Sequence, residues 1–442
     1  MATSDAFARG RFRRALNLSK LGAELAVRQA QRLVARDPAA AHRAVAETLA
    51  KELGAMKGLP MKIGQILSYM EGVLPEEYRA TYQEVLGTLR VRAAPVDSAA
   101  CLQILTDELG ARPEQAFERF DPEPIASASI GQVYRARFEG REVCVKVQYP
   151  GIKEAVDSDL ANLDGIMGLV HAVMPGIDTA AMVEDFKARL HEESDYVQEA
   201  SYQRRFAAIY RADPDLVIPE VIDARSTQRV LTTVFLDGAP IERFLPGAPQ
   251  AARDRAGQAL FRMAFGTLLE QGLFHADPHH GNLLFECGPE RRLGVLDFGC
   301  VQPVEPQAQA DLADLICAAL EGRDLMGPTE KALGISEVDD TTRRVVVDIT
   351  RQVLAPILAP QPYRFTREAA RALAKEVTDA KLKLAGKVIT RRARLGLERE
   401  GVMFVVRNLF GLASIWGTLE TQGDFRAITE QLLAGAPDAP AS

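Results

Sequence analysis

The chain has 442 residues, of which 47% are hydrophobic and 26% charged, and its net charge is -7. This length and composition are typical of a soluble globular protein with two or three domains. The negative charge argues against bulk nucleic-acid binding, which requires a basic surface. The five cysteines lack the Cys-x-x-Cys spacing of zinc sites, which favours a reducing compartment. The sequence contains no uninterrupted apolar run of about 18 residues, so it predicts no membrane-spanning helix.

Residues 12–36 alternate leucine and valine with arginine and lysine at mostly helical spacing. Such a basic amphipathic helix can lie on an anionic membrane surface or dock on its own protein, and we favour docking. No apolar signal-peptide region is present, and Asp5 stands where a basic region would be expected. We therefore expect a cytoplasmic protein, with peripheral membrane contact through residues 12–36 as the alternative.

A helical region is expected over about 38–118, interrupted at four prolines. Within it, Lys62–Gln65 (Lys-Ile-Gly-Gln) opens a short helical stretch that ends near Met70. A solvated lysine and a glycine that allows close packing would explain this tetrapeptide by themselves. Its meaning therefore depends on the residues downstream.

Strand-forming residues begin after Pro124. The next residues can be compared with the kinase nucleotide loop G-x-G-x-x-G-x-V: its last glycine and valine match, and its first two glycines are replaced by alanine. Backbone amides and serine hydroxyls can still cradle phosphates, although the Cβ atoms restrict the backbone. The nucleotide-binding residues expected here are Ala126, Ser127, Ala128, Ser129, Gly131 and Val133.

A turn at 139–141 leads into a second strand, Val143–Val147. Cys144 and Lys146 lie two residues apart and share one strand face, with the valines on the other. We expect the first face to look toward the nucleotide, with Lys146 reaching the phosphates and Cys144 covering the adenine. The alternative is that Lys146 lies on an edge strand with its charged group in water. We favour the nucleotide contact because the predicted nucleotide loop lies just upstream.

In kinases, this lysine is fixed by a carboxylate from the next helix. We expect that helix to be capped at residue 178 or 179 and to run to about residue 211. Asp195 and Glu199 share a helix face at a spacing of four residues, whereas Glu193 is turned away from both. The residues alone leave the partner of Lys146 open.

The segment Arg229–Gly238 predicts a strand that ends in a polar turn, which is typical of the hinge between kinase lobes. Adenine would hydrogen-bond to the backbone near Phe235 and Leu236. A helix from about Pro249 to Gly272 follows.

Two further motifs carry the chemistry: His275–Asn282 (His-Ala-Asp-Pro-His-His-Gly-Asn) and Asp297–Gly299 (Asp-Phe-Gly). Protein-kinase-like enzymes use an Asp and an Asn five residues apart, followed by Asp-Phe-Gly, for phosphoryl transfer. Asp277 would orient or deprotonate an acceptor hydroxyl or water. Asn282 and Asp297 would bind Mg²⁺, because polyanionic phosphates require oxygen-ligated cations.

Residues 283–285 and 292–296 predict the two strands of a small hairpin that presents both motifs at one edge. A helix is expected from Pro306, which leaves hardly any room for the activation segment on which kinases dock protein substrates. Helices then continue to about Leu433, including a buried helix over 403–419, and the final residues are expected to be disordered.

Together these motifs resemble the UbiB-like (AarF-domain) family of atypical kinases over about residues 15–420. The match covers nearly the whole chain, and six motifs in the right order make it specific. They are Lys62–Gln65 (the family's K-x-G-Q), the Ala/Ser loop with Ser-Ile-Gly-Gln-Val, Val145–Gly151, Glu193–Ala200, Phe274–His279 and Asp297–Gly299.

The resemblance implies that the helix of Lys62 and Gln65 folds across the position where a kinase seats a peptide. These two residues would contact the phosphate region and the Glu193–Asp195 motif, and Glu199 would be the partner of Lys146. The resemblance also implies binding of ATP or ADP with Mg²⁺. ATPase or small-molecule kinase activity is implied rather than protein phosphorylation, in support of isoprenoid-quinone or related lipid metabolism at a membrane surface.

The chain departs from the family pattern at three positions. His280 replaces a usual proline, Cys144 replaces an alanine, and Tyr202 stands where asparagine often follows the Glu-Ala pair. These differences bear on nucleotide affinity. The transmembrane C-terminus of some members is not found, which argues against firm membrane anchoring.

We therefore expect an α+β, two-lobed protein-kinase-like fold with a helical extension (1–120), an N-lobe with inserted helices (121–238), a helical C-lobe (239–433) and a tail (434–442). The expected function is that of a Mg-ATP-binding atypical kinase or ATPase in quinone or lipid metabolism. The alternatives are a small-molecule phosphotransferase and a nucleotide-gated lipid-binding scaffold without turnover. Neither the acceptor nor the oligomeric state follows from the sequence.

Overall fold

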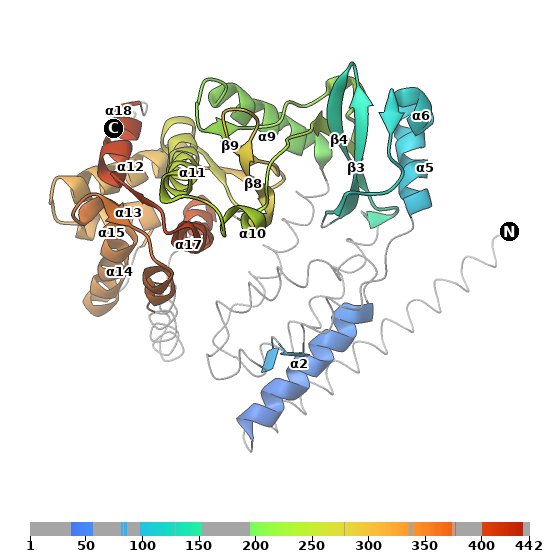
Figure 1. Cartoon of the computed structure of the whole chain (residues 1–442). Helices are drawn as coiled ribbons and strands as arrows, with labels where there is room; N and C mark the ends of the chain where they lie inside the picture. Colours follow the sequence, from blue (N-terminus) through green and yellow to red (C-terminus); the bar gives the residue numbers. More distant parts are fainter. Residues whose placement is uncertain are drawn as a thin grey trace. The chain divides into compact units, whose positions relative to one another are not determined.

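Helices and strands both occur in the computed structural model of the protein (Figure 1), and the predicted α+β class is confirmed. The described residues group into two compact units. One contains those up to 135 together with 146–152, and the other contains 136–145 and those from 195 onward. The structure describes residues 37–55, 81–82, 84–85, 98–128, 130–152, 195–277, 279–335, 339–373, 376 and 400–435.

A five-stranded sheet has the order β1-β3-β4-β6, with β2 paired to β3. Buried and less buried positions alternate in β4, because valine occupies every second residue and a strand has a period of two. Between β3 and β4, Glu139 and Gly140 have φ values of 48° and 72°, as a tight hairpin turn requires. The strands are β1 (Arg119–Phe120), β2 (Ala126–Ser127), β3 (Gly131–Phe138), β4 (Arg141–Gln148) and β6 (Val230–Val234).

Helix α9 (Tyr196–Ile209) packs against β6. It is capped by Asp195, whose Oδ1 accepts hydrogen bonds from the backbone N–H groups of Val197 and Gln198, both at 3.0 Å. Asp195 itself has non-helical dihedrals of -107° and 89°. The prediction of an unbroken helix through this position to residue 211 is therefore wrong. The acidic residues suit a helix by spacing, but a short carboxylate that bonds nearby amides favours a cap instead.

The largest hydrophobic core is organised around α11 (Gln250–Gln271), which confirms the predicted helix at 249–272. Helices α17 (Glu400–Leu419) and α18 (Phe425–Gly435) pack against it. Trp416 Nε1 donates a hydrogen bond of 2.9 Å to the carbonyl of Gly257 on α11. The C-terminal part of α17 is buried, as predicted for 403–419.

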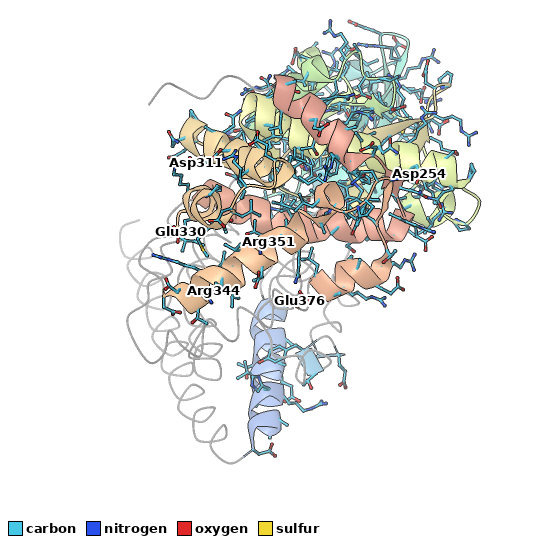
Figure 2. All side chains as sticks on the ribbon, turned by 90° about the vertical axis from the view of Figure 1, so that its left-hand side faces the viewer. Asp254, Asp311, Glu330, Arg344, Arg351 and Glu376 are labelled. Carbon is cyan, nitrogen blue, oxygen red and sulfur yellow. The ribbon has the colours of Figure 1, made fainter. Side chains whose placement is uncertain are left out.

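The segment after α17 is tied back to α11. Strands β11 (Tyr363–Arg364) and β12 (Gln422–Gly423) pair antiparallel. Asp254 of α11, labelled in Figure 2, accepts a hydrogen bond of 2.7 Å from the backbone N–H of Gln422. Thr421, beside it, is fully buried. The C-terminal strand and helix are thus part of the same core.

Two small sheets carry the segment between α11 and the next long helix. β7 (Leu273–His275) pairs antiparallel with β10 (Val301–Pro303). β8 (Leu283–Cys287) and β9 (Arg292–Val295) form a three-stranded sheet with β5 (Leu216–Val217), in the order β5-β9-β8. β8 and β9 confirm the predicted hairpin.

Helix α12 begins at Pro306, as predicted. Among the helices that are described, none is long and apolar enough to cross a membrane. The predicted segment 12–36, the Lys62–Gln65 motif and residues 436–442 lie outside the described residues. The remaining elements are α2 (Pro38–Ala55), α5 (Ser98–Leu109), α6 (Pro113–Ala116), α10 (Ile241–Phe244), α12 (Pro306–Leu320), α13 (Met326–Leu333), α14 (Asp340–Val353), α15 (Ala355–Leu358) and the 3-10 turns η1 (Asp223–Arg225) and η2 (His280–Asn282).

Candidate functional site

The loop 276–282, here called the catalytic loop, is fixed at both ends by backbone hydrogen bonds. Ala276 N donates to Cys300 O at 2.7 Å and continues the β7–β10 ladder. Leu296 N donates to Asn282 O at 3.0 Å and continues the β8–β9 ladder. The loop therefore begins beside the residue that follows Asp-Phe-Gly and ends opposite the residue that precedes it. Residues 297–299 therefore lie between the ends of the two ladders.

Asp277 and Asn282, which the sequence separates by five residues, are in direct contact. Asn282 Nδ2 donates a hydrogen bond of 2.8 Å to Asp277 Oδ2. An amide nitrogen only donates, and a carboxylate only accepts, so this bond leaves Oδ1 of Asn282 as the atom that can ligate a cation. Hard cations such as Mg²⁺ bind oxygen atoms. The orientation of Asn282 therefore fits its predicted role.

The carboxylate of Asp297 turns back on its own motif, with Oδ1 accepting a hydrogen bond of 2.9 Å from Gly299 N. Among the described residues, no group of three or more His, Cys, Asp or Glu side chains could hold a metal ion. A cation here would therefore need Asn282 and phosphate oxygens in addition to Asp297. This shared binding is usual for Mg²⁺ in nucleotide sites, and the donor set fits it.

Three buried rings connect α9 to both motifs. Phe298 packs against Phe206 of α9 and against His275, with ring centroids 5.1 and 5.4 Å apart. His275 Nε2 lies 2.6 Å from the carbonyl oxygen of Asp297, and because that oxygen can only accept, Nε2 carries the hydrogen. Sequence reasoning missed Phe206. The clue is its position seven residues after Glu199, two turns along the same helix face.

Cys144 and Lys146 share one face of β4, as predicted, and that this face looks toward the nucleotide stays a prediction. Cys144 and Lys146 are half-buried, whereas the valines between and beside them are fully buried. Glu199, in the first turn of α9, is only 2% exposed, which is unusual for a carboxylate without a functional or ionic partner. The Lys146–Glu199 pair stays a prediction. The Asp195 carboxylate caps α9, and its predicted role at the nucleotide stays a prediction as well.

The Ala/Ser loop is a tight hairpin. Ala126 pairs with Val133 and Ser127 with Gln132, and Ala128 N donates to Gly131 O at 2.8 Å. The side chains of Ala126 and Ser127 are exposed, so this hairpin can approach a ligand. Of the residues predicted to act at the nucleotide, Lys62, Gln65, Ser129 and Glu193 lie outside the described residues.

At the predicted hinge, the amide of Phe235 donates to Glu142 O at 2.9 Å and so belongs to the sheet. The predicted adenine contact is therefore restricted to the Phe235 carbonyl or to Leu236. At Gly238, a Cβ would lie 2.5 Å from Cys287 Sγ, which explains the glycine. Burial raises the pKa of the Cys287 thiol to about 11.

A narrow pocket adjoins the catalytic loop. Its polar wall comes from the loop and the end of β7, and its apolar walls come from α11, α17 and the β8–β9 pair. The polar lining is His275, Asp277, His279 and Asn282, and the apolar lining includes Leu260, Met263, Leu412 and Ile415. Sequence reasoning placed His279 in a motif but gave it no role, and it did not foresee the two residues from α17.

Comparison with known proteins identifies relatives of this arrangement. A family model described as the ABC1 atypical kinase-like domain matches residues 88–325, more than half of the chain. Protein ACTIVITY OF BC1 COMPLEX KINASE 8, chloroplastic, of Arabidopsis thaliana is 36% identical over 270 residues, which cover 59% of this chain and 35% of that protein. Atypical kinase COQ8, mitochondrial, of Saccharomyces cerevisiae is 30% identical over 259 residues, which cover 58% of this chain and 50% of that protein.

The chain thus spans about a third to a half of the length of these curated relatives. Among solved structures, the complex of Rv3197 with erythromycin from Mycobacterium tuberculosis superimposes with a TM-score of 0.59 at 29% identity. That match covers 84% of this chain and 90% of the other. The predicted kinase-like fold and the predicted family are confirmed. The chain belongs to the ABC1 atypical kinase-like family, which its motifs identified as UbiB-like.

Proposed function

We propose that the protein is an atypical kinase or ATPase that binds Mg-ATP and supports isoprenoid-quinone or other lipid metabolism. The observation that carries this proposal is the hydrogen bond of 2.8 Å between Asn282 and Asp277, in a loop whose end is bonded to the residue before Asp297. These two contacts support the proposal that Asp277, Asn282 and Asp297 act together, at one edge of the β8–β9 hairpin, on a metal and an acceptor.

In this proposal the Ala/Ser loop cradles the phosphates of the nucleotide, and the catalytic loop supplies groups for the metal and the acceptor. Asn282 Oδ1 and Asp297 would hold Mg²⁺, which neutralises charge on the phosphates when bound. Asp277 orients the acceptor hydroxyl or water and accepts its proton. Lys146, fixed by Glu199, contacts the phosphates. Adenine would lie beside Cys144 and the hinge.

Protein substrates are excluded in this proposal. The chain runs from Asp297 to the start of α12 at Pro306 with only β10 between them, so it offers no long segment on which a peptide could dock. The helix of Lys62 and Gln65 is proposed to cover the same position. Peripheral membrane contact through residues 12–36 would bring a lipid acceptor or quinone precursor to the site.

The test is Mg²⁺-dependent ATP hydrolysis with and without anionic liposomes that carry a phenol related to quinone precursors. We expect Asp277→Asn to abolish turnover while nucleotide binding persists, because Asp277 acts on the acceptor. Asp297→Asn is expected to abolish metal-dependent nucleotide binding, and unchanged binding would refute the site assignment. Nucleotide-dependent liposome binding without any turnover in the wild type would favour the scaffold function instead.

A second candidate is a phosphotransferase for a small hydroxylated molecule. It is supported by the similarity to the complex of Rv3197 with erythromycin, together with the apolar residues that line the pocket beside Asp277. Deletion of residues 1–70 distinguishes the two functions. A small-molecule phosphotransferase should keep its activity, whereas a protein with a built-in covering helix should change specificity or lose its fold.

A further inference from the structure

His279 lies on the catalytic loop between Asp277 and Asn282, and all three residues line the same pocket. Its own backbone N–H donates to Asp277 O at 2.8 Å, and its carbonyl accepts from Asn282 N at 2.9 Å. None of the roles proposed above involves this residue. Its position nevertheless places an imidazole on the segment that joins the acceptor-binding group to the metal ligand.

The hydrogen-bonding state of this imidazole is set by the backbone. Gly281 N donates a hydrogen bond of 3.0 Å to His279 Nδ1, so Nδ1 must carry a lone pair. The neutral ring then carries its hydrogen on Nε2. The ring also stacks on His280, with centroids 4.4 Å apart and an interplanar angle of 27°. The imidazole is therefore a positioned Nε2–H donor.

Glycine at position 281 is part of this arrangement. A Cβ there would lie 2.9 Å from His279 Nδ1 and 3.2 Å from Cε1, closer than these atoms can approach without a shift. The backbone of Gly281 does not have a positive φ, so conformational freedom does not explain the residue. Space for the imidazole does.

Phosphoryl transfer gives such a donor a role beside Mg²⁺ and Lys146. In a loose transition state, negative charge spreads over the three equatorial oxygens of the transferring group and must be met by positive charge or hydrogen-bond donors. Asp277 is an acceptor, and Asn282 directs its only donor group to Asp277. We infer that His279 donates its Nε2–H to an equatorial oxygen of the transferring phosphoryl group and so acts as a catalytic residue.

This inference rests on the proposed function, and its test compares two variants with opposite expectations. The amide of His279→Gln places an N–H close to the former Nε2 position but removes the acceptor for Gly281. His279→Asn keeps an acceptor near the former Nδ1 position and removes the Nε2 donor. A residue that only caps the 3-10 turn should tolerate Asn and not Gln. A catalytic donor should show the reverse.

Two readouts are measured on the full-length protein: kcat for Mg-ATP hydrolysis, and affinity for Mg-ADP with and without aluminium fluoride, which mimics the phosphoryl group in transfer. We expect His279→Asn to lower kcat about 100-fold, as loss of one transition-state donor typically does. The same variant should weaken Mg-ADP-aluminium fluoride binding by a similar factor and leave Mg-ADP binding unchanged. His279→Gln should stay within about tenfold of the wild type in both readouts.

Gly281→Ala provides an independent check, because its Cβ would displace the ring without removing it. It should resemble His279→Asn in both readouts. The inference is overturned if His279→Asn binds the aluminium fluoride complex as tightly as the wild type, or if the Gln variant is impaired as much as the Asn variant. Absence of nucleotide binding in the wild type would instead refute the proposed function itself.

Discussion

Replacing Phe206 by leucine tests whether α9 is coupled to the site through the buried rings. Phe206 is fully buried and pairs with Phe298 at 5.1 Å and His275 at 6.2 Å. Each aromatic pair contributes about 0.5–1.5 kcal/mol beyond burial, and the lost volume costs about 1 kcal/mol more. We expect the free energy of unfolding to fall by about 3 kcal/mol. About half of this loss, raising the activation free energy where Glu199 and Asp297 must be aligned, would lower kcat about tenfold.

The matched control is Phe261→Leu. Phe261 of α11 is also buried, and its ring packs against Trp416 at 5.4 Å and Phe425 at 4.9 Å. We expect a similar loss of stability in urea unfolding but a kcat for ATP hydrolysis close to that of the wild type. Equal losses of kcat in the two variants, measured where both are folded, would refute a specific link between α9 and the Asp-Phe-Gly motif.

Three other predictions follow from single contacts. Gly257→Ala would place a Cβ 2.0 Å from the buried Oγ1 of Thr421. The free energy of unfolding, measured in urea, should therefore fall by at least about 2 kcal/mol. An unchanged value would mean that α11 and the segment after α17 can move apart without loss of stability. Burial raises the pKa of the Cys287 thiol from 9.0 to about 11, so the unfolded chain loses this proton at lower pH than the folded chain. The stabilisation that the protonated thiol provides is therefore complete below pH 9 and is lost as the pH rises to 11. Serine does not titrate in this range, so the unfolding free energy of Cys287→Ser should fall less than that of the wild type between pH 9 and pH 11. The two falls should differ by at most about 3 kcal/mol, and equal falls in the two proteins would contradict the raised pKa. Asp195→Ala should cost about 1 kcal/mol through loss of the α9 cap, and Asp195→Asn much less; nucleotide affinity reduced in both variants would show that the carboxylate also acts at the ligand.

The parts of the site that follow from local patterns could be predicted from the sequence. The β8–β9 hairpin consists of two short apolar segments joined by a short turn. Each segment therefore has its neighbour in sequence as the most accessible strand to pair with. The valines of β4 likewise fix which face Lys146 occupies. The family resemblance added the roles of individual residues, which spacing alone left open.

Other features depend on competition or on packing between distant segments. Asp195 fits either the interior or the end of a helix, and only its bonds to two backbone amides decide for the end. The backbone N–H of Phe235 could donate to adenine or to the sheet, and it donates to the carbonyl oxygen of Glu142. Leu412 and Ile415 of α17 reach the pocket because α17 packs on α11, a contact that no local pattern encodes.

The short connection between Asp297 and α12 has a consequence for control. In many kinases the corresponding stretch is ordered by a phosphate added to one of its own hydroxyl side chains. Here β10 already pairs with β7, and residues 298–328 contain no serine, threonine or tyrosine. Phosphorylation of a hydroxyl side chain therefore cannot be what orders this stretch. The pairing of β10 with β7 holds it in place without such a modification.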